Sequence, residues 1–532
     1  MILLIVQSAN KKSSNNLDKW IIVTKEAKLL QEKVYDIAII GGGVNGCGVA
    51  RDAAGRGLSV LLLEKNDLAS GTSSASSKMV HGGLRYLEQY EFMLVAKALK
   101  EREVLLSIAP HIISPLRLVL PHHKALRPKW MIRIGLFLYD TLGGRKLLDP
   151  SHQIDLRKDV VGKVLKPEFT HGFEYSDCKV DDARLVVLNA VDARQHGADI
   201  KTRCELKQGF REKDHWRLQA KDVISGQENE YKARILVNAA GPWVSEVVSD
   251  RIMLDTTSDV RLVKGSHIVV PKLFDHDRAY IFQNADNRVI FAIPFQKEFT
   301  LIGTTDVDMT GNPGGADVSK DEVDYLCNAA NEYFTKAIKP DDVIWEFAGI
   351  RPLFDDGEDA ASEITRDYVL ELLDEQGAPP MLSVFGGKIT TYRKLAETVF
   401  DELKQWLPNL KPSWTAKSPL PGGDFLPDDL EKQITGLQRD FPFLAPETAR
   451  RLFEAYGTNT RQMLGGCKTQ EDMGICFGTD LYQREVEYLI DREWAISVED
   501  IIWRRSKTGL FMSAKEIAAL ENWLKSRNAL NL

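Results

Sequence analysis

The chain has 532 residues, of which 44% are hydrophobic and 27% are charged, and its net charge is −7 at pH 7. This length and composition allow two or three hydrophobic cores and argue against a low-complexity or disordered chain. The acidic balance argues against nucleic acid as the main partner. No stretch approaches the roughly 18 consecutive apolar residues that span a bilayer, so we expect no transmembrane helix.

Targeting and metal signals are weak. The apolar first six residues lack a basic lead and soon give way to a polar stretch, so no secretory signal is expected. The six cysteines show neither Cys-x-x-Cys nor zinc spacing, which is typical of reduced thiols in a cytosolic compartment. The adjacent His122 and His123 have no third ligand at a suitable spacing, so no metal site is predicted.

Residues 35–64 read as a strand, a glycine turn, a helix and a second strand that ends on an acid. Gly41 permits the tight turn, Gly43 lets backbone N–H groups approach a pyrophosphate, and Gly46 lets the helix pack on the sheet. Glu64 closes the unit, where its carboxylate accepts hydrogen bonds from ribose hydroxyls. A glycine-rich turn of an ordinary α/β protein is the alternative, but the complete order predicts dinucleotide binding.

A run rich in small hydroxyl residues, 67–78, follows this unit. Such a run can wrap the extended phosphate and ribose groups of a flavin dinucleotide, or it can be a flexible linker. Its place between a strand and a periodic helix that begins near Phe92 favours cofactor contact. Two later apolar runs, ending at Asn238 and Phe385, also lead into small residues, and helix starts of this kind bind anions.

Seven segments of the chain, in one order, resemble those of the FAD-dependent respiratory sn-glycerol-3-phosphate dehydrogenase family, within the D-amino-acid-oxidase-like flavoproteins. The segments are Gly41-Gly42-Gly43-Val44-Asn45-Gly46, Thr72-Ser73-Ser74-Ala75-Ser76-Ser77-Lys78, His81-Gly82-Gly83-Leu84-Arg85-Tyr86-Leu87-Glu88, Lys264-Gly265-Ser266-His267, Ile302-Gly303-Thr304-Thr305-Asp306, Gly349-Ile350-Arg351-Pro352-Leu353 and Phe385-Gly386-Gly387-Lys388-Ile389-Thr390-Thr391-Tyr392-Arg393.

The resemblance implies an α/β fold in which a Rossmann-like FAD-binding domain is interleaved with an antiparallel-sheet substrate domain. We expect these two domains in residues 34–417 and a mainly helical C-terminal domain in 418–532. Residues 1–33 look like an extension relative to the family. Strand-like runs near 261–270, 288–294 and 299–303 agree with the expected substrate sheet.

The implied reaction is oxidation of sn-glycerol 3-phosphate to dihydroxyacetone phosphate, with hydride transfer to FAD and electrons passed to ubiquinone or menaquinone. The residues expected to bind the cofactor are Gly41, Gly43, Asn45, Gly46, Glu64, Thr72, Ser73, Ser77, Gly82, Gly83, Ala240, Gly241, Gly387, Lys388 and Thr390.

A dianionic substrate needs cations, and both the arginine fork and the lysine point charge suit a phosphate. Arg85, Arg351 and Lys388, with Thr390, are the candidate phosphate ligands; each cation lies beside glycine or proline, and a solvated charge is the alternative for each. His267 is the candidate base, because a histidine beside a cation stays neutral near pH 7. With Arg351 and Tyr86 it forms the predicted catalytic set.

Residues 124–146 carry six cations against one acid, interleaved with aromatic and aliphatic side chains. Such a segment can seat apolar groups among lipid headgroups, or it can be an ordinary helix that covers the core. With the resemblance, it predicts peripheral attachment to the cytoplasmic face of the inner membrane. A homodimer is also among the expected assemblies.

Three alternatives stay open at this point. An oxygen-using glycerol-3-phosphate oxidase would share the flavin and phosphate motifs. An amine or amino-acid oxidase of the same fold group would bind a carboxylate and an amine. In a non-enzymatic nucleotide-binding or scaffold protein, no substrate would reduce the bound flavin.

Overall fold

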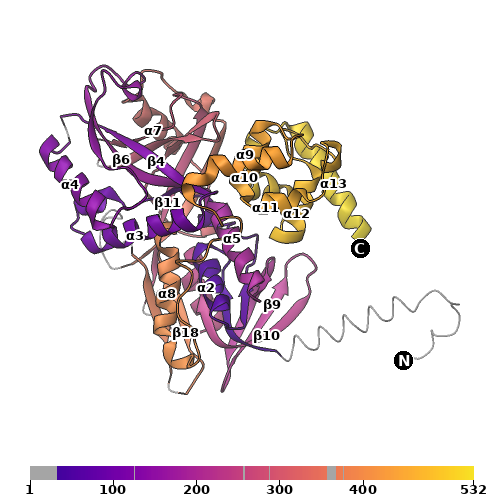
Figure 1. The fold of residues 1–532 in the computed structure, drawn as a ribbon. Helices are drawn as coiled ribbons and strands as arrows, with labels where there is room; N and C mark the ends of the chain where they lie inside the picture. The colour runs from indigo at the N-terminus through magenta and orange to yellow at the C-terminus, as the bar shows by residue number, and fades with distance from the viewer. Residues whose placement is uncertain are drawn as a thin grey trace, which may run out of the picture.

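The computed structural model describes residues 33–531 except 125, 256–257, 285, 287, 356–366 and 376. The predicted N-terminal extension therefore lies outside the described residues, apart from Lys33. The described chain builds two large sheets and a group of helices at the C-terminal end (Figure 1).

The first sheet has the strand order β17-β18-β10-β1-β2-β7, with β9 paired to β10 and β8 paired to β9. The strands are β1 (Val34–Ile40), β2 (Val60–Leu63), β7 (Asp199–Lys201), β8 (Cys204–Arg211), β9 (Trp216–Asp222), β10 (Glu228–Asn238), β17 (Val369–Leu373) and β18 (Met381–Phe385). The central strands β18, β10, β1, β2 and β7 run parallel, so their carboxyl ends meet at one edge.

Helices cover one face of this sheet because parallel strands must be buried on both sides. The helices α2 (Val44–Gly55), α5 (Asp182–Gln195) and α8 (Tyr392–Glu402) pack together there (Figure 1). Their small and apolar side chains form one core with those of the strands, including Ile37, Ala50 and Val186, all fully buried.

The second sheet has the order β15-β11-β14-β13-β12-β4-β6-β3, with β16 on β11 and β5 on β6. The strands are β3 (Met79–Val80), β4 (Ile113–Pro121), β5 (His152–Asp155), β6 (His171–Val180), β11 (Val260–Pro271), β12 (Ala279–Gln283), β13 (Val289–Phe295), β14 (Phe299–Gly303), β15 (Val307–Met309) and β16 (Trp345–Phe354). The prediction of an antiparallel sheet is right except for β4 and β12, which pair in parallel.

The two sheets are interleaved along the chain, as predicted, because the chain leaves the first sheet after β2, builds part of the second, and returns at β7 and again at β17. Three helices flank the second sheet: α3 (Phe92–Ile108), α4 (Lys129–Leu142) and α7 (Lys320–Asn331) (Figure 1). The predicted helix near Phe92 is present; Val95 and Leu99 are buried, whereas Phe92 itself is exposed. No helix in the described ranges is long and apolar enough to cross a membrane.

The C-terminal region is helical, as predicted, with its own apolar core. It contains α9 (Leu430–Asp440), α10 (Pro446–Tyr456), α11 (Asn459–Leu464), α12 (Gln483–Glu493), the π-helical turn η12 (Asp500–Arg505) and α13 (Ala514–Asn531). The predicted division at residue 418 stays a prediction.

Candidate active site

The glycine turn after β1 admits no side chain at two of its positions. Gly41 has φ of +110°, and a Cβ there would lie 2.5 Å from the carbonyl oxygen of Ala239. A Cβ on Gly46 would lie 2.0 Å from the carbonyl oxygen of Gly41. Strand β1, the turn and α2 therefore pack as closely as the sequence motif predicts.

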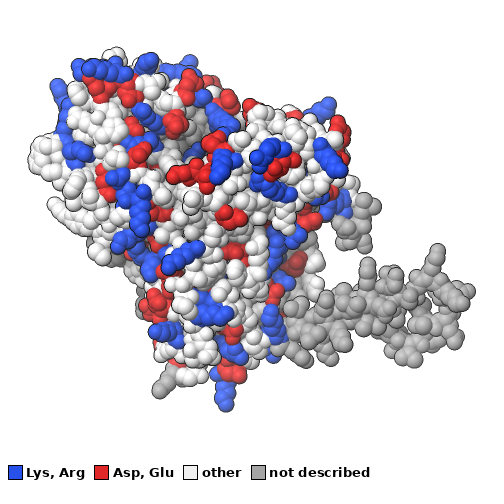
Figure 2. All heavy atoms as spheres, viewed as in Figure 1, with Lys and Arg blue, Asp and Glu red and all other residues white. Residues whose placement is uncertain are grey.

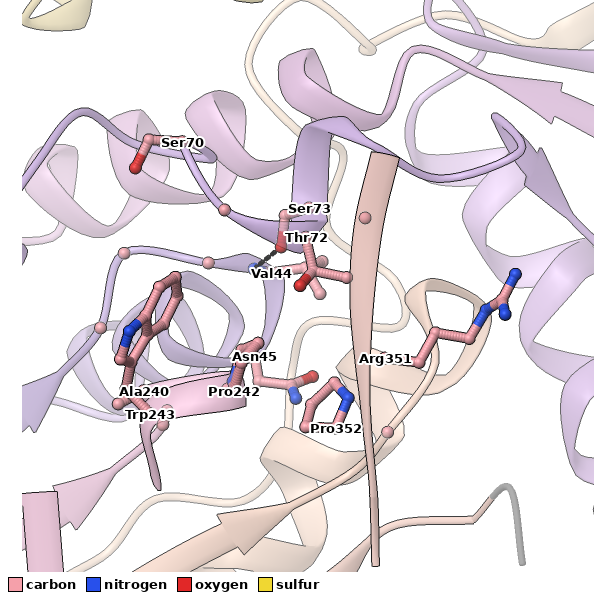
Figure 3. Close-up of a pocket in the computed structure, with 18 of the residues that line it drawn as sticks. Val44, Asn45, Ser70, Thr72, Ser73, Ala240, Pro242, Trp243, Arg351 and Pro352 are labelled. Atoms are coloured by element: carbon pink, nitrogen blue, oxygen red, sulfur yellow. Dashed lines mark hydrogen bonds between the residues drawn. The ribbon is translucent and has the colours of Figure 1, made fainter. Parts of the chain in front are cut away.

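A cavity of about 540 Å³ opens at the carboxyl edge of the first sheet and extends to the second sheet (Figure 3). This volume is in the range of cofactor and ligand sites. The predicted site residues that line it are Gly41, Gly43, Asn45, Glu64, Thr72, Ser73, Ser77, Tyr86, Ala240, Gly241, His267, Arg351, Gly387, Lys388 and Thr390. Among the described residues that line it, Gly46, Gly82, Gly83 and Arg85 do not occur.

The nucleotide end of the cavity combines a helix N-terminus with an acid. The Val44 backbone N–H donates to Ser73 Oγ at 3.0 Å, which ties the hydroxyl-rich loop to the first turn of α2 (Figure 3). Burial raises the pKa of Glu64, while N–H groups of Gly42 and Asn66 donate to its carboxylate at 2.6 and 2.7 Å and oppose that rise. These groups suit a pyrophosphate on the helix and a ribose on the acid.

Two further observations fit a dinucleotide at this edge. Asn45 Oδ1 is buried and has no hydrogen-bond partner among the described residues, although its Nδ2 donates to the carbonyl of Gly386 at 3.3 Å. A Cβ on Gly43 would meet only Ser73 Oγ within 4 Å, so the backbone there faces open space. Both leave polar groups of the turn free to meet a ligand.

The other end of the cavity holds His267, from β11, within reach of the loop 72–78. Ser77 Oγ lies 2.9 Å from His267 Nε2, and the imidazole stacks on Phe347 with a centroid separation of 4.9 Å. Nδ1 is buried and has no hydrogen-bond partner in the described chain. Burial lowers the pKa of His267 well below its ordinary value, and Arg351 and Lys78 act in the same direction. The imidazole is therefore neutral near pH 7, which is the form that a general base needs.

The cations of this end are Arg351, which lies within β16, and Lys388, which lies in the turn after β18. Lys388 Nζ lies 3.8 Å from the ring centroid of Tyr86. Arg351 is held by Asp306 and by Thr304, whose Oγ1 accepts from Nη2 at 3.0 Å. Five N–H donors let Arg351 keep these partners and still bind an anion. Figure 3 places Arg351 across the cavity from Trp243.

The motif that contains Gly82, Gly83 and Arg85 serves a second purpose, in packing. The Gly82 N–H donates to the Tyr139 hydroxyl at 2.8 Å, and a Cβ on Gly82 would lie 2.4 Å from Leu99. Gly83 has φ of +77° at the start of the short helix η2 (Leu84–Leu87). Cofactor binding by these glycines and phosphate binding by Arg85 stay predictions.

His81 also lines the cavity, although we did not predict it as a site residue. Thr390 Oγ1 accepts from the His81 N–H at 3.2 Å and lies 3.3 Å from its carbonyl oxygen. Burial lowers the pKa of His81, with Lys388 acting in the same direction and Asp177 against it. The sequence did contain an indication that His81 belongs to the site, because His81 opens one of the family motifs. A histidine next to glycines does not by itself show which cavity it faces.

Across the described ranges of the chain, no group of three or more metal-binding side chains occurs. His122 and His123 instead make separate contacts to backbone carbonyls, of Arg127 and Gln283.

An interleaved pair of sheets, with a dinucleotide turn at one end of a cavity and a histidine beside cations at the other, is the arrangement of a flavin-dependent oxidoreductase. The chain belongs to the FAD dependent oxidoreductase family, whose model matches residues 36–393. Residues 413–525 match the model for the C-terminal domain of alpha-glycerophosphate oxidase. The cofactor is therefore FAD, and the fold is the one predicted.

Curated relatives match nearly the whole chain. A "Glycerol-3-phosphate dehydrogenase" of Pseudomonas aeruginosa is 51% identical over 93% of this chain and 96% of its own. An "Aerobic glycerol-3-phosphate dehydrogenase" of Escherichia coli is 48% identical over 92% and 97%. A "D-erythritol 1-phosphate dehydrogenase" of Brucella abortus is 48% identical over 94% and 99%.

Solved structures of FAD-containing proteins have a similar fold. The glycerol-3-phosphate dehydrogenase from Bacillus halodurans complexed with FAD has a TM-score of 0.74 and 26% identity, and the match covers 95% of this chain and 96% of that one. An L-alpha-glycerophosphate oxidase from Mycoplasma pneumoniae with FAD bound has a TM-score of 0.55 at 18% identity, over 73% of this chain and 99% of that one. The second likeness shows the fold alone.

Proposed function

We propose that this protein oxidises sn-glycerol 3-phosphate to dihydroxyacetone phosphate and that its electrons pass to a membrane quinone, ubiquinone or menaquinone. The carrying observation is that Lys388 and Arg351 line the same end of the FAD cavity as the neutral His267. The names of the relatives support the same substrate class.

Each of these residues has a role that follows from its chemistry. Arg351 and Lys388 bind the phosphate, since their charges and donors match its oxygens, with Thr390 as a hydroxyl donor. His267 takes the proton of the C2 hydroxyl, and Tyr86 orients the substrate beside Lys388. When bound, the flavin supplies the acceptor for the hydride that leaves C2. His81 is the second candidate for the base, because it lines the same cavity.

The decisive test is anaerobic mixing of the purified yellow protein with sn-glycerol 3-phosphate while the flavin absorbance is followed. We expect rapid bleaching, and dihydroxyacetone phosphate as the product. A flavin that stays oxidised would contradict the proposal. Bleaching that is faster with D-erythritol 1-phosphate would assign the longer polyol phosphate as substrate, as in the relative with that name.

Each remaining alternative predicts a different outcome, in the anaerobic assay or in air. Stoichiometric peroxide in air would identify an oxygen-using oxidase. Bleaching by glycine or D-amino acids alone would identify an amino-acid oxidase. A protein that binds FAD but is reduced by none of these would be a non-enzymatic binder.

The structure supports a membrane-binding surface on α4. Only Leu136 and Tyr139 of this helix are buried, whereas Trp130, Ile134 and Phe137 are 63%, 51% and 58% exposed. An ordinary amphipathic helix buries its aromatic side chains. Figure 2 shows uncharged surface beside lysine and arginine at the left edge, where Figure 1 places α4.

Neighbouring segments extend this apolar surface. Helix α4 packs against α3 and η2, and close to these lie Tyr90 and Met93, which are 80% and 83% exposed. We propose that this surface attaches the protein to the cytoplasmic face of the inner membrane, where apolar groups enter the headgroup region and Lys129 meets anionic lipid. A homodimer, and the domain boundaries at 34–417 and 418–532, are also retained as proposals.

A further inference from the structure

The π-helical turn η12 of the C-terminal region is bound by ion pairs to loops of the first sheet, which carries the dinucleotide turn. Arg505 donates from Nη1 and Nη2 to Asp67 at 2.8 and 2.9 Å, and Arg504 Nε donates to the same carboxylate at 2.7 Å. Asp67 is 1% exposed; burial alone raises its pKa, but the two arginines bring it to about 2. The carboxylate is thus ionised, and η12 is fixed to the loop that follows β2.

A second ion pair holds the other end of the turn. Arg203 Nη2 donates to both carboxylate oxygens of Asp500, at 2.8 and 2.6 Å. Asp500 is fully buried and also accepts from the backbone N–H of Ile496 at 2.8 Å. Trp503 lies between Asp500 and Arg504 in the turn, so ion pairs on both sides of it fix its position relative to the first sheet.

Trp503 contacts the second sheet at β16 and begins a series of aromatic contacts that ends at His267. Its indole stacks on Trp345 with centroids 4.7 Å apart and planes 19° apart. Trp345 contacts Phe347 at 4.7 Å, and Phe347 stacks on His267 at 4.9 Å and 11°. Trp345 and Phe347 are two residues apart on β16, so both point to one face of the strand.

The chain leaves space for this indole. A Cβ on Gly509 would lie 2.8 Å from Cε2 and Cζ2 of Trp503, two atoms of a rigid ring. The φ of Gly509 is outside the left-handed region, so the glycine is needed for space rather than for backbone conformation. An alanine there would have to displace the indole or the chain around it.

We propose that Trp503 is a positioning residue for His267, acting through Trp345 and Phe347, and that this is a role of the C-terminal domain in the reaction. Hydrogen bonds alone do not fix the imidazole, because Nδ1 has no partner in the described chain and Nε2 meets only Ser77. The stack supplies the missing constraint on the ring plane. The inference rests on the proposed function in that His267 is taken as the base.

The test compares Trp503→Ala with Trp503→Phe and with a matched control, Trp523→Ala. Trp523 also belongs to the C-terminal core, but it contacts Phe477, at 5.4 Å, and not the stack. Three quantities are measured on the holoenzyme: the exchange rate of the imidazole C2 hydrogen of His267 by mass spectrometry, the anaerobic rate of flavin reduction, and KM. The dissociation constant of FAD is measured by titration of the apoprotein.

We expect Trp503→Ala to speed exchange at His267 several-fold and to slow flavin reduction about tenfold, since small misplacements of a reacting group are costly. KM and FAD affinity should change little. Trp503→Phe should restore most of the rate, and Trp523→Ala should match the wild type in exchange at His267. Equal exchange and rate in Trp503→Ala and Trp523→Ala would overturn the proposal.

Three further variants keep the outcome decisive. If Trp503→Ala does not fold, Trp345→Leu and Gly509→Ala disturb the same stack, and unchanged exchange at His267 in both would overturn the proposal. His267→Asn separates this inference from the proposed function. If that variant reduces flavin at the wild-type rate, His267 is not the base, while the exchange measurement still reports whether Trp503 holds its ring.

Discussion

Ser77 Oγ and His267 Nε2 lie 2.9 Å apart, although 190 residues separate them along the chain. One residue belongs to the loop that lines the nucleotide end of the cavity, and the other to strand β11 of the second sheet. This contact ties the loop between β2 and β3 to strand β11 of the second sheet.

Replacement of Ser77 by alanine removes that hydrogen bond. One such bond contributes about 1 kcal/mol, so we expect the anaerobic rate of flavin reduction to fall roughly two- to tenfold while FAD content is preserved. Stopped-flow absorbance measures the rate. Ser74→Ala is the control, since within the described part of the chain its hydroxyl hydrogen-bonds to the Gly71 carbonyl alone, at 3.4 Å. Equal rates in both variants would show that Ser77 does not orient His267.

Lys388→Met removes a cation from the substrate end of the cavity. Hydrogen bonds to charged groups contribute about 1.5–3 kcal/mol, so kcat/KM for glycerol 3-phosphate should fall about 10- to 100-fold. Steady-state assays with an artificial electron acceptor measure this loss. Lys388→Arg should recover part of it, and Lys336→Met, at an exposed lysine in the segment after α7, should have no effect. An equal loss with unphosphorylated glycerol would exclude a phosphate contact.

Serine in place of Trp130, Ile134 and Phe137 removes the exposed apolar groups of α4. We expect binding to vesicles that contain phosphatidylglycerol to fall roughly tenfold or more, because these side chains would no longer enter the lipid. Flotation of the protein with vesicles measures binding, and turnover with a soluble dye should be unchanged. The control replaces Val223 and Ile224, which are 48% and 67% exposed on another part of the surface. Equal losses in the two variants would place the membrane contact elsewhere.

His111 should make stability depend on pH. It is 4% exposed, neither ring nitrogen has a hydrogen-bond partner among the described residues, and burial, aided by Arg184, lowers its pKa to about 3. Below about pH 6.5, His111 binds a proton in the unfolded chain but not in the folded protein. The free energy of unfolding therefore decreases as the pH falls, by about 1.4 kcal/mol at pH 5.5.

The melting temperature at pH 7.5 and pH 5.5 tests this effect. The fall between the two values should be smaller in His111→Leu than in the wild type. His152→Leu, at a histidine whose side chain is 56% exposed, is the control and should keep the wild-type fall. If the melting temperature of His111→Leu falls as much as that of the wild type, other groups cause the pH dependence.

The sequence by itself determined the dinucleotide unit, the FAD cofactor and the helical C-terminal region. The dinucleotide unit follows from local rules, because the turn at Gly41 needs a left-handed backbone and Gly46 must lack a side chain. The FAD cofactor and the helical C-terminal region follow from the resemblance of several motifs to one family. Family motifs also led to His267, Arg351 and Lys388, which the structure brings to one cavity.

Only the tertiary structure decided which of these side chains meet. It paired Arg351 with Asp306, left Arg85 outside the described cavity lining, added His81 to it, and brought Trp503 within a stack that reaches His267. The physical reason is that strand register and domain packing set contacts across hundreds of residues, whereas a motif records only its own neighbours. The exposure of Trp130 on α4 was likewise undetermined, because apolar spacing is the same for a helix that covers a core and one that faces lipid.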